Sequence, residues 1–158
     1  MLDMRVVGPK RWKQHSIVDL ASKLGISERV RVVGYVDEPD LVALYSGAQF
    51  SVYASLFEGF GLPIIESMAC GTPVITSNTS CMPEISGGAA LLVEPTDTQE
   101  IMQAIVELSN NQQLRLELKR KGIVNSEKFC WKNAASQMQD IYRSVAQTQL
   151  LHNAAENS

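Results

Sequence analysis

The stretch Glu58-Gly-Phe-Gly-Leu-Pro-Ile-Ile-Glu66 decides how this chain folds, because it joins a strand to a helix through a glycine-rich turn. The preceding residues Phe50–Tyr53 alternate apolar and small side chains, as a strand does. Gly59 and Gly61 permit backbone angles and a close approach of a ligand that a side chain would obstruct. The sequence therefore predicts a strand that ends in a tight turn.

A helix is predicted directly after this turn. Pro63 presets the backbone angle of a first helical position, apolar residues follow at helical spacing, and Gly71 ends the helix before Pro73. The N-terminus of such a helix carries about half a positive charge and unpaired N–H groups, which suit an anion such as phosphate. Pro63 has no N–H, so the expected donors are Gly61, Leu62 and Ile64.

Two carboxylates frame this predicted anion site. Glu58 lies at the carboxyl end of the strand, where open parallel sheets bind ligands, and Glu66 lies one turn inside the helix. A carboxylate beside a phosphate is repulsive unless it faces hydroxyls, which a sugar or ribose supplies at about 1.5–3 kcal/mol per charged hydrogen bond. The pattern indicates a sugar phosphate. A plainer interpretation stays open, in which Glu58 is a solvated loop residue and Glu66 only interacts with the helix dipole.

Short apolar strands alternate with helical periods along the chain. The strands are expected at 4–7, 30–33, 50–53, 74–76 and 90–93, and the last third is helical. This alternation predicts an α/β fold, a Rossmann-like, mainly parallel sheet with helices on both faces.

The helical last third carries three local predictions. Thr96 and Gln99 are expected to form a capping box at a helix start. The chain turns polar from residue 147, so we divide it into a domain at 1–146 and a polar C-terminal tail at 147–158. The final helix is expected to turn one apolar stripe toward the core, formed by Ala134, Met138, Ile141 and Val145.

Composition excludes several classes of protein. A chain of 158 residues with 45% apolar residues and a net charge of −3 fits one globular domain and argues against a nucleic-acid surface. Its three cysteines and two histidines lack the spacing of a disulfide framework, a metal site or a His-based nucleophilic triad. There is no apolar run of about 20 residues, so no transmembrane segment is expected, and the free thiols fit a cytoplasmic protein.

Cations are missing from the middle of the chain. From Val32 to Glu100 there is no Lys or Arg, whereas nine residues are acidic. A diphosphate at the turn would therefore meet backbone amides and no side-chain cation of this span. The neutralising charge must come from Lys10, Arg11 and Lys13 or from a segment before residue 1, and we favour the second source.

Several motifs in this order resemble one family. The chain is similar to the C-terminal, donor-binding half of the retaining GT-B glycosyltransferases with a Glu-x(seven)-Glu signature, the glycosyl transferases group one. The resemblance covers nearly the whole chain, and the order of the motifs makes it far more specific than a single Gly-Phe-Gly. The matching motifs are Met4–Pro9, Val30–Val36, Ala43–Ala48, Glu58–Pro63, Glu66–Val74, Pro83-Glu84 and Ala89–Val93.

The resemblance implies a role for each matching position. Glu58 would be the catalytic residue in the sense that it positions the donor sugar through its hydroxyls, without acting as a nucleophile. Glu66 would accept hydrogen bonds from the ribose. The sugar and diphosphate would also lie against Gly59, Phe60, Gly61, Leu62 and Ile64. The nucleobase would lie beside Gly34, Tyr35 and Val36.

The resemblance also implies a reaction. The family transfers a hexose of mannose or glucose type from a UDP- or GDP-hexose to a glycan or glycolipid, as in polysaccharide biosynthesis, with retention of configuration. No metal or other cofactor is expected. The full-length enzyme would be cytoplasmic, and a peripheral position at the inner membrane surface stays open. A non-catalytic nucleotide-binding α/β module is the alternative, and a sugar-nucleotide epimerase is less favoured because Glu58–Gly61 is not expected there.

The chain departs from this family at its beginning. A complete member has an N-terminal acceptor domain, and its C-terminal domain opens with a strand and a loop that carry an Arg and a Lys for the diphosphate. Without them we expect the chain to be inactive alone and to self-associate through exposed inter-domain surface. The missing strand is central in the order 3-2-1-4-5-6. We therefore expect the sheet to close up, to pair Met4–Val7 with Phe50–Tyr53, or to borrow a strand from another copy.

Overall fold

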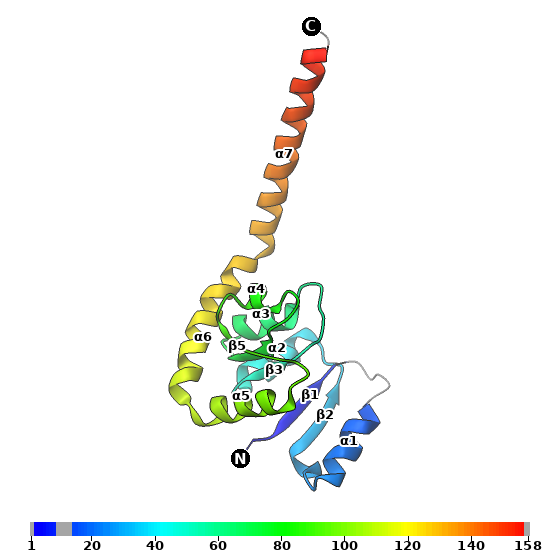
Figure 1. The fold of residues 1–158 in the computed structure, drawn as a ribbon, viewed down its shortest axis with the longest axis vertical. Coiled ribbons are helices and arrows are strands. Elements are labelled where there is room, and N and C mark those ends of the chain that lie inside the picture. The colour runs from blue at the N-terminus through cyan, green and yellow to red at the C-terminus, as the bar shows by residue number, and fades with distance from the viewer. Residues whose placement is uncertain (1, 9–13, 157–158) are drawn as a thin grey trace.

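The computed structural model describes residues 2–8 and 14–156 (Figure 1). Every strand predicted from the sequence is present within a residue of its expected position. Lys10, Arg11 and Lys13 lie outside the described residues. The elements in chain order are β1 (Met4–Val7), α1 (Gln14–Lys23), η1 (Ser27–Arg29), β2 (Val30–Gly34), α2 (Glu38–Gly47), β3 (Ser51–Tyr53), α3 (Leu62–Ala69), β4 (Val74–Ser77), α4 (Met82–Ser86), β5 (Ala90–Val93), α5 (Thr98–Asn110), α6 (Gln112–Ser126), η2 (Glu127–Phe129) and α7 (Trp131–Glu156).

The strands form two separate parallel sheets. One has the order β1-β2, with Met4 opposite Val30, and the other has the order β3-β4-β5, with Ser51 opposite Val74. All described pairs are parallel, as strands joined by crossover helices must be. Each sheet has a strand order that fits one side of the doubly wound order 3-2-1-4-5-6, and no described strand joins the two sheets.

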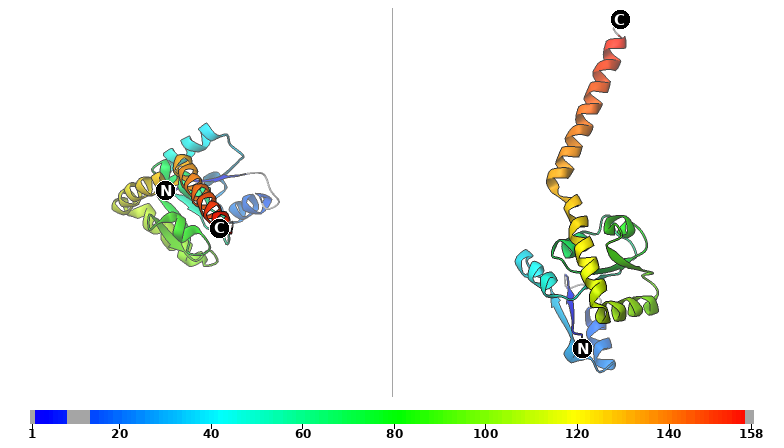
Figure 2. Two further views of the ribbon diagram at one scale, coloured as in Figure 1. Left: turned by 90° about the horizontal axis from the view of Figure 1, so that it is seen from above. Right: turned by 90° about the vertical axis from the view of Figure 1, so that its left-hand side faces the viewer.

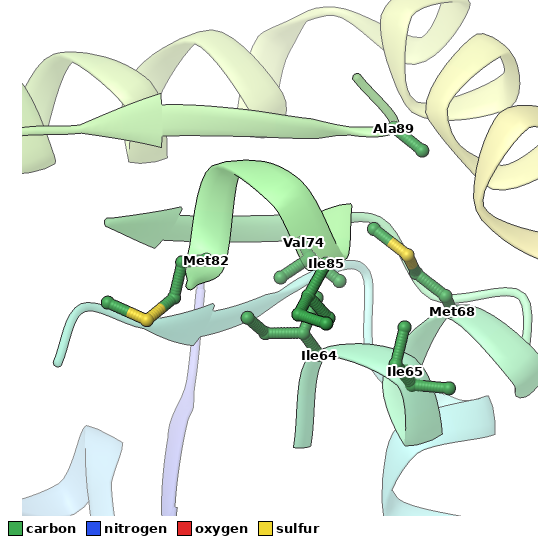
Figure 3. Close-up of a cluster of buried hydrophobic side chains, with 7 residues drawn as sticks. All are labelled: Ile64, Ile65, Met68, Val74, Met82, Ile85 and Ala89. Carbon is green, nitrogen blue, oxygen red and sulfur yellow. The ribbon is translucent and has the colours of Figure 1, made fainter. Parts of the chain in front are cut away.

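The expectations for the missing strand are tested by this topology. Within the described residues β1 does not pair with β3, so the sheet has not closed up and the predicted direct pairing is wrong. In Figure 3 the faint violet β1 runs in a different direction from the faint cyan β3. Two strands can form the hydrogen bonds of a sheet only where they run alongside each other. Borrowing of a strand from another copy stays a prediction.

The three-stranded sheet carries the core on both of its faces. Successive residues of a strand point to opposite faces, so Val74 and Ile75 of β4 enter different clusters. Figure 3 shows the first cluster, in which α3 and α4 pack on the face of Val74. In the second cluster Ile75 packs with Leu108 of α5 and Leu118 of α6. Every residue of β4 is buried.

The first sheet has almost no core of its own. Between residues 2 and 60 the described side chains include only two buried residues, Ala21 and Gly34. In α1 the side chains of Val18 and Leu20 are more than half exposed, at 52% and 55%. Parallel strands are usually covered on both faces. The β1-α1-β2 unit is therefore only partly covered.

The predicted capping box of α5 is wrong. The N-cap is Asp97, whose Oδ1 accepts from the N–H groups of Gln99 at 2.8 Å and Glu100 at 3.1 Å. The hydroxyl of Thr96 instead donates to Glu94 Oε1 at 2.7 Å. One aspartate oxygen satisfies two free N–H groups of the helix start, so the neighbouring threonine is not needed as the cap.

Helix α7 projects away from the rest of the chain (Figures 1 and 2). The predicted core stripe is wrong, because Ala134 is exposed and Met138, Ile141 and Val145 are each about half exposed. The pattern gave an apolar face, but no described element covers it (Figure 1). The helix continues across residue 146, and the division into domain and tail stays a prediction.

Candidate functional site

The turn before α3 has the geometry that its glycines predict. Gly61 is the N-cap and adopts φ 89° and ψ 45°, in the left-handed region. A Cβ on Gly61 would also lie 3.1 Å from Cδ1 of Ile64. Leu62 is the first helical residue, so the prediction that Pro63 takes this place is wrong by one position. A proline at the second position still needs no N–H partner, because the first N–H groups of a helix have none.

One of the predicted anion donors is already engaged. The N–H of Ile64 donates to the carbonyl of Gly61 at 3.0 Å. A phosphate at the helix start would have to compete with this bond for Ile64. A Cβ built on Gly59 meets nothing within 4 Å, so the backbone there lies open. Phe60 turns its ring away to an edge-to-face contact with Phe129, with centroids 5.8 Å apart.

Glu58 is held in place by two hydroxyls. Its Oε1 accepts from the hydroxyl of Tyr53 at 2.6 Å and from that of Ser55 at 2.7 Å. These two hydrogen bonds, that of Tyr53 first, lower the pKa of the Glu58 carboxyl below its ordinary value. Glu58 is half-buried, so it is not the freely solvated loop residue of the plainer interpretation. It is an ionised and oriented carboxylate.

The backbone of Glu58 is fixed by the loop that follows β4. Ser80 Oγ donates to the carbonyl of Glu58 at 3.0 Å, and Cys81 Sγ donates to the same oxygen at 3.3 Å. Ser77 Oγ donates to the carbonyl of Ser55 at 2.5 Å. Ser80 adopts φ 56°, the single positive φ among non-glycine residues that the structure describes. This loop was not predicted from the sequence, although the polar run Thr76–Ser80 at the end of a strand was a signal for it.

Glu66 is exposed on α3 and lies beside α2. The hydroxyl of Tyr45 donates to Glu66 Oε2 at 3.5 Å, the long limit of a hydrogen bond. The carbonyl of Tyr45 in turn accepts from Thr72 Oγ1 at 2.6 Å, which ties α2 to the end of α3. Burial, followed by the nearby charge of Glu66, raises the pKa of Tyr45 to about 12. Tyr45 is therefore a neutral donor at physiological pH.

The predicted nucleobase residues lie at the end of β2, in the other sheet. Gly34 is buried with φ 84°, and its carbonyl accepts from the N–H of Gly8 at 2.9 Å. Tyr35 is 81% exposed and Val36 is half-buried. No hydrogen bond or ring contact of the described chain joins these residues to the turn at Glu58. The structure places Glu58, Gly61 and Glu66 along one turn and the helix that follows it, and no described contact links Tyr35 to them.

In the part of the chain that the structure describes, no cation is paired with Glu58 or Glu66. The ion pairs found in residues 2–8 and 14–156 are Lys121 with Glu117 and Arg143 with Asp140, both within single helices. This agrees with the cation-free span that the sequence shows around the turn.

Comparison with known proteins gives the family. Residues 2–124 match the model of the family described as glycosyl transferases group 1. The chain belongs to this family. This group 1 glycosyltransferase chain is 34% identical over 136 residues to the O-antigen chain mannosyltransferase B of Escherichia coli. The aligned region covers 86% of this chain and 36% of that relative. It is 33% identical over 135 residues to a D-inositol 3-phosphate glycosyltransferase of Saccharomonospora viridis, covering 82% of the chain and 31% of the relative.

Solved structures agree with the family and with the fold. Sucrose-phosphate synthase from Thermosynechococcus elongatus superposes with a TM-score of 0.81 and 31% identity, over 91% of this chain and 38% of that one. Alr3699/HepE of Anabaena, solved in complex with UDP and glucose, gives a TM-score of 0.79 at 23% identity, over 90% of this chain and 40% of that one, and supports the fold alone. The predicted Rossmann-like α/β fold and the GT-B resemblance are confirmed. The group 1 chain spans about a third of the length of the relatives it matches.

No helix of the described residues combines the length and the apolar content that crossing a bilayer requires.

Proposed function

We propose that this chain is the donor-binding part of a retaining hexosyltransferase, which moves a mannose- or glucose-type sugar from a UDP- or GDP-hexose to a glycan or glycolipid. The observation that carries the proposal is the local unit of Glu58, Gly61 and Glu66, in which two carboxylates flank a left-handed turn and a helix start. Membership of the group 1 glycosyltransferases supports it. Relatives named as mannosyltransferases support mannose as the transferred sugar.

Each part of the turn has a task in this function. Glu58 accepts hydrogen bonds from hydroxyls of the donor sugar, and Glu66 accepts them from the ribose. The backbone of the turn and of the helix start, from Gly59 to Ile64, faces the sugar and the diphosphate, and Gly34, Tyr35 and Val36 line the nucleobase. The acceptor attacks on the face that the diphosphate leaves, while fixed N–H donors stabilise the negative charge that develops on the leaving group. No metal ion takes part.

The rest of the catalytic machinery lies outside this chain in the proposal. The side-chain cations for the diphosphate and the acceptor domain belong to the remainder of a longer enzyme, and this chain is inactive alone. That enzyme is cytoplasmic, with a peripheral position at the inner membrane surface. It has no nucleic-acid partner.

A titration of the chain with nucleotides tests the donor site. UDP, GDP, UDP-glucose and GDP-mannose are added up to about millimolar concentration and followed by amide NMR shifts. Glu66→Ala is expected to weaken every nucleotide by about tenfold, because all of them carry a ribose. Glu107→Ala, which removes an exposed carboxylate from α5, is the matched control. If the wild-type chain binds none of the four nucleotides, the proposal of a donor site is wrong. If Glu66→Ala binds them with the same affinity as the wild-type chain, the proposed ribose role of Glu66 is wrong.

A non-catalytic nucleotide-binding module is the second candidate. The observation that favours it is the absence of a cation beside either carboxylate in the part of the chain that the structure describes. The DNA upstream of Met1 discriminates between the two. A reading frame that continues into an acceptor domain supports the transferase, and a native stop codon supports the module.

A further inference from the structure

The carboxylate of Glu58 is held from one side only. Both described donors, the hydroxyls of Tyr53 and Ser55, bind the same oxygen, Oε1, at 2.6 and 2.7 Å. Within the described residues no hydrogen bond reaches Oε2. A carboxylate has about four lone-pair sites, two on each oxygen. The two hydroxyls therefore use the acceptor capacity of Oε1 and leave that of Oε2 to another donor.

The two donors are themselves fixed by the neighbouring strand. The carbonyl of Tyr53 accepts from Thr76 Oγ1 of β4 at 2.9 Å, and its ring packs against the first core cluster. The carbonyl of Ser55 accepts from Ser77 Oγ, also of β4, at 2.5 Å. Strand β4 is fully buried. The hydroxyls that reach Glu58 thus belong to residues whose backbone is hydrogen-bonded to a fully buried strand.

We propose that Tyr53 and Ser55 are positioning residues that orient Glu58 so that Oε1 is satisfied by the protein and Oε2 is presented to a hydroxyl of the donor sugar. This inference rests on the proposed function and names the groups that act on its central carboxylate. Tyr53 and Ser55 then govern the part of the affinity that comes from the sugar. They have no effect on the part that comes from the nucleoside diphosphate.

The electrostatics around Glu58 agree with this assignment. The charged and titratable groups that face the carboxylate from the packed elements are the Tyr53 phenol and the Cys81 thiol, which donates to the carbonyl of Glu58. No Lys or Arg occurs between Val32 and Glu100. The two hydroxyls, and no cation of this span, lower the pKa of Glu58. Burial and then the bond to Glu58 raise the pKa of Tyr53, so it stays a donor.

The first test separates sugar binding from nucleotide binding. Tyr53→Phe keeps the ring in the core cluster and removes only the hydroxyl, while Tyr142→Phe, on the exposed helix α7, is the matched control. Dissociation constants are measured for the pairs UDP and UDP-glucose, and GDP and GDP-mannose. We expect Tyr53→Phe to weaken the preferred sugar nucleotide by about tenfold and to leave the matching diphosphate unchanged. Ser55→Ala has a smaller effect of the same kind.

A second test needs no ligand. The carboxyl carbon of Glu58 is followed by NMR against pH in the wild-type chain and in both tyrosine variants. Because the Tyr53 hydroxyl favours the ionised form, Tyr53→Phe is expected to raise the pKa of Glu58, and Tyr142→Phe to leave it in place. An unchanged pKa of Glu58 in Tyr53→Phe overturns the inference.

The outcomes of the binding test are also decisive. If Tyr53→Phe weakens a diphosphate and its sugar conjugate equally, the tyrosine has only a structural role and the inference is wrong, while the proposed function stands. If the wild-type chain binds none of the four nucleotides, the proposed function fails and this inference fails with it.

Discussion

The two sheets of this molecule are built from similar strands and differ in what covers them. Strand β1 (MRVV) has three exposed residues of four, whereas all four residues of β4 (VITS) are buried. The second sheet has helices on both faces, whereas the first sheet packs mainly against α1 and the short η1, both through β2. Val74 is buried in β4, whereas Val7 is exposed in β1. Burial is therefore set by the neighbours of a strand, and the first sheet lacks neighbours that its apolar side chains could use.

The largest expected difference is between the part of the chain around the first sheet and the part around the second sheet. It lies in how much stability each loses when an apolar side chain is removed. Ile75→Ala empties a fully buried position between β4 and α5, and we expect it to lower the free energy of unfolding by about 2–5 kcal/mol. Leu20→Ala removes a side chain of α1 that is 55% exposed, and its effect is expected to stay within about 0.5 kcal/mol. Urea unfolding measures both. Equal losses would mean that the two halves are equally packed.

Hydrogen exchange sharpens the comparison without a mutation. Amides of thinly covered elements exchange through local opening, whereas core amides require global unfolding. The amides of Val6 and Val32 in the first sheet are expected to exchange about 100 times faster than those of Ile75 and Thr76, relative to their unstructured rates. Mass spectrometry of short peptides or NMR measures this ratio. Uniform protection across both sheets would contradict it.

A glycine pair tests how tightly the second half is packed. Gly87 and Gly88 both have positive φ, but a Cβ on Gly87 would lie 2.3 Å from Oδ1 of the buried Asn125, whereas one on Gly88 meets nothing within 4 Å. We expect Gly88→Ala to cost about 1–2 kcal/mol from backbone strain alone. Gly87→Ala should cost about 1–3 kcal/mol more, because Asn125 also donates to the carbonyl of Ile85 and cannot move freely. Equal thermal shifts in the two variants would show that Asn125 yields easily.

The smallest expected effect concerns the hydrogen bond that links α2 to α3. Tyr45 of α2 donates to Glu66 over 3.5 Å, a long bond at an exposed carboxylate. Under the proposed ribose role of Glu66, Tyr45→Phe should weaken UDP by about threefold and leave 2′,3′-dideoxy-UDP unchanged. The two dissociation constants are measured in parallel. Equal weakening of both nucleotides would indicate that Tyr45 shapes α2 and does not orient Glu66.

The sequence predicts local features of this molecule well. The strand positions and the helix after Gly61 follow from short patterns, because alternation and turn residues act over a few positions. Tyr53 and Ser55 were within reach of the same reasoning, since both lie within five residues of Glu58. The prediction of the N-cap of α5 was wrong because Thr96 and Asp97 are adjacent and both have side chains that can cap a helix. Which of them is the cap depends on which side-chain oxygen reaches the free N–H groups of the helix.

Features that depend on distant residues could not be predicted. Ser80 holds the carbonyl of Glu58 across 22 positions of the chain, and only the adjacency of β3 and β4 brings them together. The apolar residues of α7 have the spacing of a buried helix face. Spacing alone, however, does not show whether another element packs against that face. The same holds for β1 and β3, which do not pair and which run in different directions in Figure 3.

Helix α7 has a practical consequence for spectroscopy on this chain. Its 26 residues extend for about 39 Å at 1.5 Å per residue, and a solitary helix in water melts gradually instead of in one step. The far-ultraviolet circular dichroism signal therefore mixes this gradual loss with the cooperative transition of the packed sheet. The fluorescence of Trp131 does not separate them, because this residue lies at the start of α7 and is 87% exposed. The unfolding of the core is better followed by the methyl resonances of its buried isoleucines.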